Sequence, residues 1–220
     1  MNPLTIGAVI VVLALIVYFI WFMPAVKTSD VVIVGGSQRG DSQVSLPLAL
    51  PLSFNQTEGI VYSYSGWLLV RDFTIGYGNR RTILSKDDSP GLYIDSTSNS
   101  LVVAIKTYGT TETILIPDMP AQKWIHFAIV VNQQAVDIYI NGMLRQHHTL
   151  GQLPDQNEKP IVMGPGWDGV LGRVTYYARS LTSEEVKKQA SEAPPSDLYT
   201  KPSSPQYFDI SWYIGRLNSV

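Results

Sequence analysis

Side chains that could bind a metal ion or catalyse a reaction are few in this sequence, and they are widely spaced. His147 and His148 are adjacent, so on a strand they point to opposite faces and cannot bind one metal ion together. His126 lies in an apolar run and is interpreted as a hydrogen-bonded core histidine. Calcium needs several convergent oxygen ligands, but the loop aspartates are scattered (Asp87, Asp88, Asp95, Asp118 and Asp168). We predict no metal site and no cofactor, with a loop calcium site as the less favoured alternative.

Catalytic groups are not arranged in any pattern that supports hydrolysis. Glycoside hydrolysis needs two carboxylates that flank the scissile bond. Glu184 and Glu185 instead fall at a predicted helix start, and Asp87-Asp88 falls in a predicted turn. The chain also has no G-x-S-x-G element and no cysteine nucleophile. We therefore predict that the chain has no catalytic residues and is not an enzyme.

One loop could contact a ligand without catalysis. The run from Gly164 to Gly169 reads GPGWDG, and its Trp167 and Asp168 are the candidate glycan contacts. An aromatic ring at this position could stack on a sugar. The alternative is that the Trp167 ring packs beneath the loop and serves the fold alone.

The elements that must position these residues are predicted to be strands. From Trp124 to Val131 both interleaved sets of side chains are largely apolar, which predicts a strand buried on both faces. Ala135 to Asn141 alternates in polarity, Asn141-Gly142 is suited to a tight hairpin turn, and Met143 to Leu150 is the returning strand.

A further strand and a short helix follow. Gly169 to Tyr177 is strand-like, and Thr182 with Glu185 forms a capping box at the start of a helix. Leu181 and Val186 are spaced to form a hydrophobic staple across that helix start.

This order resembles the laminin-G-like, concanavalin A-like jelly-roll family. The matching positions are Trp124, His126, Ala128, Ile138, Tyr139, Asn141, Gly142, Gly169, Val174, Tyr177, Arg179, Leu181, Thr182, Glu184 and Glu185. The resemblance implies an all-β, concanavalin A-like (laminin-G-like) β-sandwich jelly roll. One departure is Gly172-Arg173, where the family usually carries an Asp-Glu pair.

Other strand-like runs alternate with turn residues, which also favours an all-β sandwich. They are Tyr62 to Val70, Phe73 to Tyr77, Arg81 to Ser85, Gly91 to Ile94, Leu101 to Ile105 and Thr113 to Ile116. The predicted organisation is a transmembrane anchor (1–26), a connector (27–51) with one strand-like patch at Val31–Val34, the sandwich (52–190) and an extended arm (191–220).

The N-terminal run from Leu4 to Met23 carries no charge and is long enough, at ~1.5 Å per residue, to span a bilayer as a helix. Tyr18, Trp21, Phe22 and Met23 end it, and the aromatic residues match an interfacial belt. A retained single-pass anchor is therefore predicted in preference to a cleaved signal peptide, and the orientation is left open.

Composition and the C-terminal arm complete the analysis. A net charge of −2 with 15% charged residues excludes a basic surface for nucleic acid, and zero cysteine excludes disulfides. The arm carries aromatic residues suited to docking (Tyr207, Phe208, Trp212 and Tyr213).

Two functions remain open. The first is a membrane-anchored, non-catalytic structural protein that links a lipid bilayer to neighbouring capsid-like proteins, resembling minor capsid proteins of large icosahedral DNA viruses, in a virion internal membrane. The alternative is a glycan-binding lectin or adhesion module at a cell surface.

Overall fold

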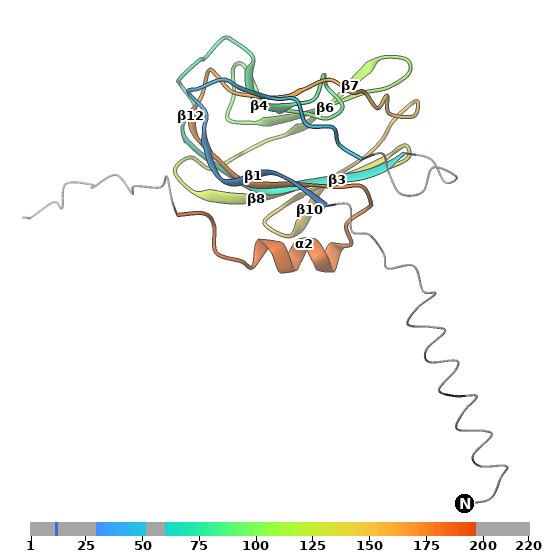
Figure 1. The fold of residues 1–220 in the computed structure, drawn as a ribbon. Helices are drawn as coiled ribbons and strands as arrows, with labels where there is room; N and C mark the ends of the chain where they lie inside the picture. Colours follow the sequence, from blue (N-terminus) through green and yellow to red (C-terminus); the bar gives the residue numbers. More distant parts are fainter. Residues whose placement is uncertain (1–11, 13–29, 52–59, 197–220) are drawn as a thin grey trace, which may run out of the picture.

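The computed structural model describes residue 12 and residues 30–51 and 60–196 (Figure 1). These residues form two stacked six-stranded sheets in which all strand pairs are antiparallel. Sheet A has, in spatial order, β1 (Asp30–Arg39), β12 (Asp168–Tyr177), β3 (Val61–Asp72), β8 (Trp124–Asn132), β9 (Ala135–Ile140) and β10 (Met143–Thr149). Sheet B has β2 (Val44–Leu46), β11 (Ile161–Met163), β4 (Arg81–Ser85), β5 (Gly91–Ile94), β6 (Leu101–Lys106) and β7 (Thr111–Ile116).

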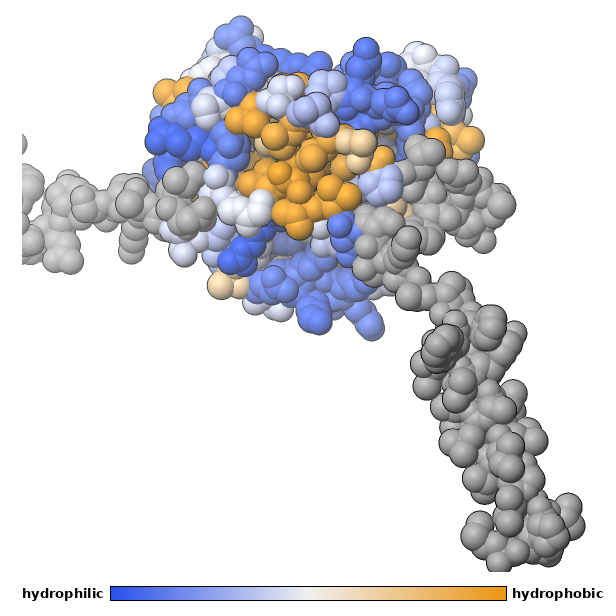
Figure 2. Space-filling model, in the orientation of Figure 1, coloured by the Kyte–Doolittle hydropathy of each residue, from blue (hydrophilic) through white to orange (hydrophobic). Residues whose placement is uncertain are grey.

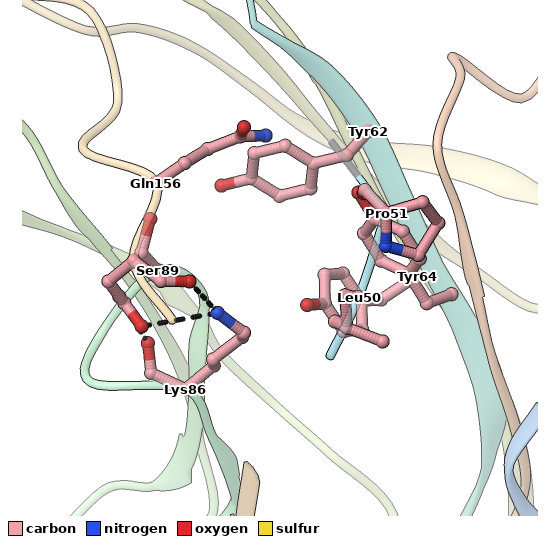
Figure 3. Close-up of a pocket in the computed structure, with 9 residues that line it drawn as sticks. Leu50, Pro51, Tyr62, Tyr64, Lys86, Ser89 and Gln156 are labelled. Atoms are coloured by element: carbon pink, nitrogen blue, oxygen red, sulfur yellow. Dashed lines mark hydrogen bonds between the residues drawn. The ribbon is translucent and has the colours of Figure 1, made fainter. Parts of the chain in front are cut away.

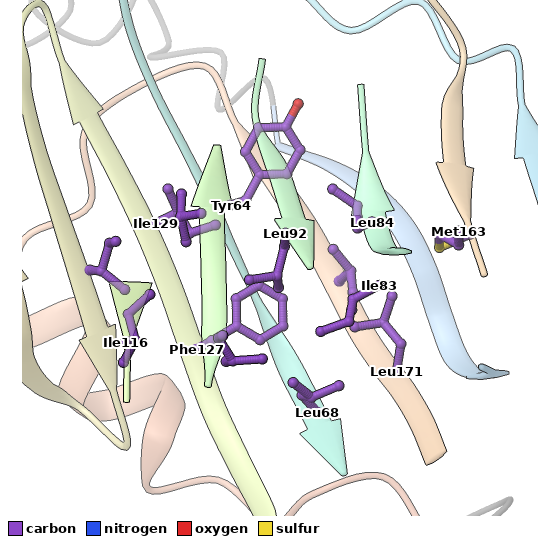
Figure 4. Packing of buried hydrophobic residues seen from close by; sticks show 14 of the residues in the cluster. Tyr64, Leu68, Ile83, Leu84, Leu92, Ile116, Phe127, Ile129, Met163 and Leu171 are labelled. Carbon is purple, nitrogen blue, oxygen red and sulfur yellow. The ribbon is translucent and has the colours of Figure 1, made fainter. Parts of the chain in front are cut away.

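The main core fills the space between the two sheets. Alternate residues of each strand point inward, so Leu68 and Phe127 of sheet A meet Leu92 of sheet B (Figure 4). Gly66 lies among these side chains, and a Cβ there would come within 2.9 Å of a Val174 methyl group. The sandwich predicted from the sequence is thus confirmed, with apolar side chains from both sheets forming one continuous core.

Sheet A also carries a second, smaller core on its outer face. Helix α2 (Ser183–Ala190) begins with the predicted capping box: the Thr182 side chain accepts from the Glu185 N–H, and the Glu185 carboxylate accepts from the Thr182 N–H. Leu181 and Val186 are 3% and 0% exposed and belong to a cluster with Ala128, Val130 and Tyr139. The helix therefore covers the outer face of sheet A, which explains why β8 is buried on both faces (Figure 1).

Two predicted boundaries differ from the structure. β1 and β2 lie within the predicted connector, so the sandwich begins at Asp30 rather than near Leu52. Both are edge strands, and the short stretch Val31–Val34 is only part of a ten-residue strand that pairs with β12.

The predicted strand Phe73–Tyr77 is wrong. The Asp72 carboxylate accepts from the Thr74 N–H at 2.7 Å, which turns the chain directly after β3. The carbonyl groups of Phe73 and Ile75 then accept from the buried Arg81 guanidinium. A side chain from a neighbouring strand therefore takes the hydrogen bonds that a strand at Phe73–Tyr77 would need.

Apolar side chains reach the surface on the side where β1 and β2 form the sheet edges. Alternate residues of the segment 44–50 are half-buried against the core, namely Val44, Leu46, Leu48 and Leu50. Figure 2 shows hydrophobic atoms gathered across the middle of this face of the molecule. The apolar side chains of this segment pack against the core on one side and are partly exposed to solvent on the other.

The predicted anchor residues Leu4, Tyr18, Trp21, Phe22 and Met23 lie outside the described residues, as do the arm residues Tyr207, Phe208, Trp212 and Tyr213. Within the part of the chain that the structure does describe, no helix has the length and apolarity needed to cross a membrane.

His126 is a core histidine, as predicted, and its hydrogen bonds define its tautomer. It is 1% exposed on the outer face of β8, with Nε2 3.0 Å from the Ser65 hydroxyl. That hydroxyl donates its single hydrogen to Gln189 Oε1 of α2, so Nε2 of His126 is the donor in its bond to Ser65. Nδ1 has no partner, and burial lowers the pKa of the imidazole to about 4.

This burial predicts a pH-dependent stability. Between pH 6.5 and about 4 the unfolded chain binds a proton at His126 that the folded chain does not, so the free energy of unfolding falls as pH decreases through this window. The loss at His126 is bounded at about 3 kcal/mol, because each pKa unit corresponds to about 1.4 kcal/mol. Denaturant titrations of His126→Gln should show a shallower fall than the wild type, while the exposed, non-titrating control Gln146→Ala keeps the wild-type fall. Parallel curves for wild type and His126→Gln would contradict this account.

Candidate functional site

The outer face of sheet B carries a groove that helix α2 does not cover. Along β5, β6 and β7 the side chains that do not enter the core point outward, and they are mostly small or polar. They border a hollow of about 390 Å³, here called the outer groove, lined by Arg80, Asp88, Tyr93, Ile94, Asp95, Ser96, Val102, Ala104, Thr111 and Thr113. A concave surface with a few polar groups on an apolar floor is the usual form of a small-ligand site.

Three side chains form the polar centre of the outer groove. The Arg80 guanidinium lies 3.6 Å from the centroid of the Tyr93 ring, a cation–π contact. Asp88 Oδ1 accepts from Arg80 Nη2 at 2.7 Å and also accepts from the Tyr93 hydroxyl. The Arg80 side chain is 58% exposed, whereas Tyr93 is 5% exposed beneath it. Arg80 therefore presents donors to solvent from a position that Asp88 and Tyr93 hold.

Arg80 and Tyr93 also line a second hollow of about 430 Å³, which Thr82, Ser85, Asp87, Lys159, Pro160 and Val162 complete. The two hollows share the Arg80–Tyr93 pair, so the groove extends across sheet B on both sides of it. No sequence motif marked this pair. Arg80 and Tyr93 meet only because β4 and β5 pair as antiparallel neighbours.

The turn between β4 and β5 positions the aspartates of this site. Asp87 and Asp88 both adopt positive φ (52° and 59°), a conformation that aspartate tolerates better than most residues. The Asp88 carbonyl accepts from the Lys106 N–H of β6, which ties the turn to the sheet. Burial raises the pKa of Tyr93 to about 12, with its bond to Asp88 acting in the same direction, so its hydroxyl remains a donor at neutral pH.

The groove carboxylates are engaged in hydrogen bonds or ion pairs. Asp95 accepts from the Thr97 N–H and from the Ser98 hydroxyl, and the first of these lowers the pKa of Asp95 most. Asp87 forms an ion pair with Lys106 at 3.1 Å. A general acid must hold a proton at working pH, so Asp95, which is held ionised, is unsuited to that role.

The predicted contact residues of the GPGWDG loop take different positions. Trp167 is 2% exposed, its Nε1 donates to the Thr82 carbonyl at 3.0 Å, and its ring fills space over Gly40 and Gly169. The ring thus lies beneath the loop, as in the alternative interpretation, and no face of it is open for stacking on a sugar. Asp168 is 40% exposed and pairs with Arg71 at 3.2 Å.

The histidines and aspartates that could bind metal are separated. His147 pairs with Asp137 at 2.6 Å and His148 with Glu112 at 2.8 Å, on opposite sides of β10. Over residues 30–51 and 60–196, no three His, Asp or Glu side chains are grouped so that they could hold a metal ion.

The fold is a two-sheet β-sandwich of the concanavalin A-like type, and the comparisons agree with this class. A laminin-G-type family model, described as concanavalin A-like lectin/glucanases superfamily, matches residues 38–187. The chain belongs to this superfamily, as the resemblance in its sequence implied. No curated protein matches the sequence.

Solved structures with a similar fold include three botulinum neurotoxin domains. The serotype D binding domain has a TM-score of 0.59 and 16% identity over 76% of this chain and 47% of its own. The receptor binding domain of neurotoxin D has a TM-score of 0.58 and 16% identity over 74% and 48%. The serotype D ligand binding domain in complex with N-acetylneuraminic acid has a TM-score of 0.58 and 15% identity over 74% and 45%. This chain spans about half the length of these structures, and at such identity the likeness concerns the fold alone.

The position of Trp167 predicts a structural role. Trp167→Phe removes the indole N–H bonded to Thr82 and part of the ring that covers Gly40, so we expect the free energy of unfolding to fall by about 1–3 kcal/mol. Denaturant titration with Tyr108→Phe, an exposed aromatic, as the control measures this change. Equal stability of the two variants would contradict the structural role.

Proposed function

We propose that this chain is a non-catalytic carbohydrate-binding protein whose ligand occupies the outer groove. The observation that carries the proposal is the Arg80–Asp88–Tyr93 centre on a sheet face that no other described element covers. Membership of a superfamily of lectins and glucanases supports it. The structural neighbour that was solved with N-acetylneuraminic acid supports it further, because a related sandwich there accompanies a sugar ligand.

The chemistry of the groove suits sugar hydroxyl groups. A guanidinium has five N–H donors in a rigid fork, and Asp88 takes one of them. Adjacent sugar hydroxyls can accept from such a fork while they donate to carbonyl or hydroxyl oxygens. Thr111, Thr113 and Ser96 contribute hydroxyls to the lining of the groove, and Val102 and Ala104 contribute apolar surface.

The carboxylates of the outer groove favour binding of the sugar without hydrolysis. Asp88 is held between Arg80 and Tyr93, Asp95 caps its own turn, and Asp87 pairs with Lys106. Each carboxylate thus has a structural role in its own turn. Hydrolysis would need one of them to be a protonated acid and another a nucleophile or base.

The proposal includes presentation from a membrane. The uncharged run from Leu4 to Met23 supports a single-pass anchor, with the aromatic residues Tyr18, Trp21 and Phe22 at one interface. The sandwich begins at Asp30, so only a few residues separate the run from the first strand. The sandwich would therefore be held close to a lipid surface.

Glycan binding is tested with the full-length chain in detergent. A glycan array identifies the preferred sugar, and calorimetry then compares wild type with Arg80→Ala, Tyr93→Ala and the control Arg145→Ala, an exposed arginine on β10 of the other sheet. We expect Arg80→Ala and Tyr93→Ala to weaken binding at least about tenfold, or ~1.4 kcal/mol, and Arg145→Ala to leave it unchanged. The assignment would be overturned if the chain bound no glycan on the array, or if Arg80→Ala, Tyr93→Ala and Arg145→Ala bound the sugar with equal affinity.

A second candidate is a structural protein that links a membrane to neighbouring capsid-like proteins. The observation that favours it is the pair of edge strands β1 and β10, which carry exposed apolar side chains at Val32, Met143 and Leu144. An open strand edge with apolar side chains favours pairing with another protein.

Crosslinking mass spectrometry of the chain from its native membrane separates the two candidates. Under the structural candidate, crosslinks from β1, β10 and the Tyr207–Val220 segment reach one repeating shell protein, and deletion of that segment prevents assembly. Under the glycan-binding proposal, the same deletion leaves sugar affinity unchanged and no shell protein is crosslinked.

A further inference from the structure

A polar hollow that is separate from the outer groove lies at one end of the sandwich, between the two sheets. Tyr62 and Tyr64 line it from sheet A, and Lys86 and Ser89 line it from the β4–β5 turn of sheet B (Figure 3). This end recess has a volume of about 30 Å³. One water molecule needs roughly 10–15 Å³ measured in this way, so the end recess holds about two water molecules or one carboxylate group.

Two hydroxyl groups at the end recess are buried without a partner. The Tyr62 hydroxyl and the Ser89 hydroxyl belong to residues that are 2% and 6% exposed; the two lie near each other, but neither has a hydrogen-bond partner within 3.5 Å. Figure 3 shows the Tyr62 hydroxyl pointing into the same space as the Lys86 ammonium. A buried polar group without a partner is costly, so these two hydroxyls indicate that something else supplies their hydrogen bonds.

Lys86 adds a positive charge that has no carboxylate partner. The residue is 6% exposed, and its ammonium donates to the carbonyl and side-chain oxygens of Asn157. Among the described carboxylates none forms an ion pair with it. An ammonium has three N–H donors, so one remains for a ligand. Burial lowers the pKa of Lys86, and the charges of Glu158 and Asp87 offset this only in part, so a bound anion would reduce the remaining cost of desolvation.

The end recess lies beside a larger cleft of about 490 Å³. Leu50, Lys86, Gln156 and Asn157 line both spaces, so the two spaces adjoin at these residues. The remaining wall of this end cleft is mostly apolar, with Pro47, Leu48, Ala49 and Pro160. The one acidic side chain, Glu158, borders the end cleft and not the end recess.

We infer that this end of the sandwich binds a small organic acid. The end recess takes the carboxylate, which accepts hydrogen bonds from Tyr62, Ser89 and Lys86, and the apolar wall of the end cleft contacts the body of the molecule. The site is separate from the outer groove, and it depends on a different set of side chains. It does not rest on the proposed carbohydrate function.

Benzoate is the probe ligand, and benzyl alcohol, which has the same ring but no charge, is its control. Calorimetry with the full-length chain compares wild type with Tyr62→Phe, Lys86→Met and the exposed control Lys123→Met. We expect benzoate to bind wild type and Lys123→Met equally, to bind Tyr62→Phe about tenfold more weakly, and to be lost from Lys86→Met. Arg80→Ala, which tests the outer groove, should bind benzoate as wild type does.

Three outcomes would overturn the inference. They are that benzyl alcohol binds as tightly as benzoate, that Lys86→Met retains wild-type affinity for benzoate, or that inorganic phosphate replaces benzoate with the same dependence on the variants. Thermal unfolding provides a second readout that remains valid if Lys86→Met does not fold. Without ligand, Tyr62→Phe should unfold at or above the wild-type temperature, because the substitution removes an unpaired hydroxyl. Added benzoate should raise the unfolding temperature of the wild type more than that of Tyr62→Phe.

Discussion

Burial of sheet A on both faces is the constraint on which the rest of this structure depends. Its inner face packs on sheet B, and its outer face packs on α2 through Leu181 and Val186. The segment after the helix continues this cover, since Pro195 lies over Gly172 and the Ala193 carbonyl accepts from Arg173. With both faces of sheet A occupied, the broad surface left for a ligand is the outer face of sheet B.

The turn between β4 and β5 contributes to both polar hollows. Asp88 reaches the outer groove, while Lys86 and Ser89 reach the end recess. Positive φ at Asp87 and Asp88 reverses the chain so that neighbouring side chains point to different sides of sheet B. Four consecutive residues, Lys86 to Ser89, thus contribute to two sites, and hydrogen bonds from β6 and from the 154–158 segment keep the turn in place.

Much of the architecture could be predicted because it follows from local patterns. Both interleaved sets of side chains on β8 are buried, as the sequence predicted. The Asn141-Gly142 turn has positive φ at both residues, and the Thr182–Glu185 capping box is formed. β1 and the Phe73–Tyr77 segment were predicted less well. β1 carries Gly35-Gly36 and register shifts against β12, so its pattern is irregular, and Phe73–Tyr77 is held by Arg81 from another strand.

The sequence by itself determined the class of fold, the helix start, the lack of cysteine chemistry and the apolar N-terminal run, because each depends on neighbouring residues or on composition. The tertiary structure alone decided where ligands could bind. Strand pairing brings Arg80 onto Tyr93, and stacking of the sheets brings Tyr62 to Lys86. It also places Trp167 beneath its loop, where its N–H reaches a carbonyl 85 residues away in the sequence. Such contacts have no signature in a single sequence, since the residues that make them are neighbours only in the folded chain.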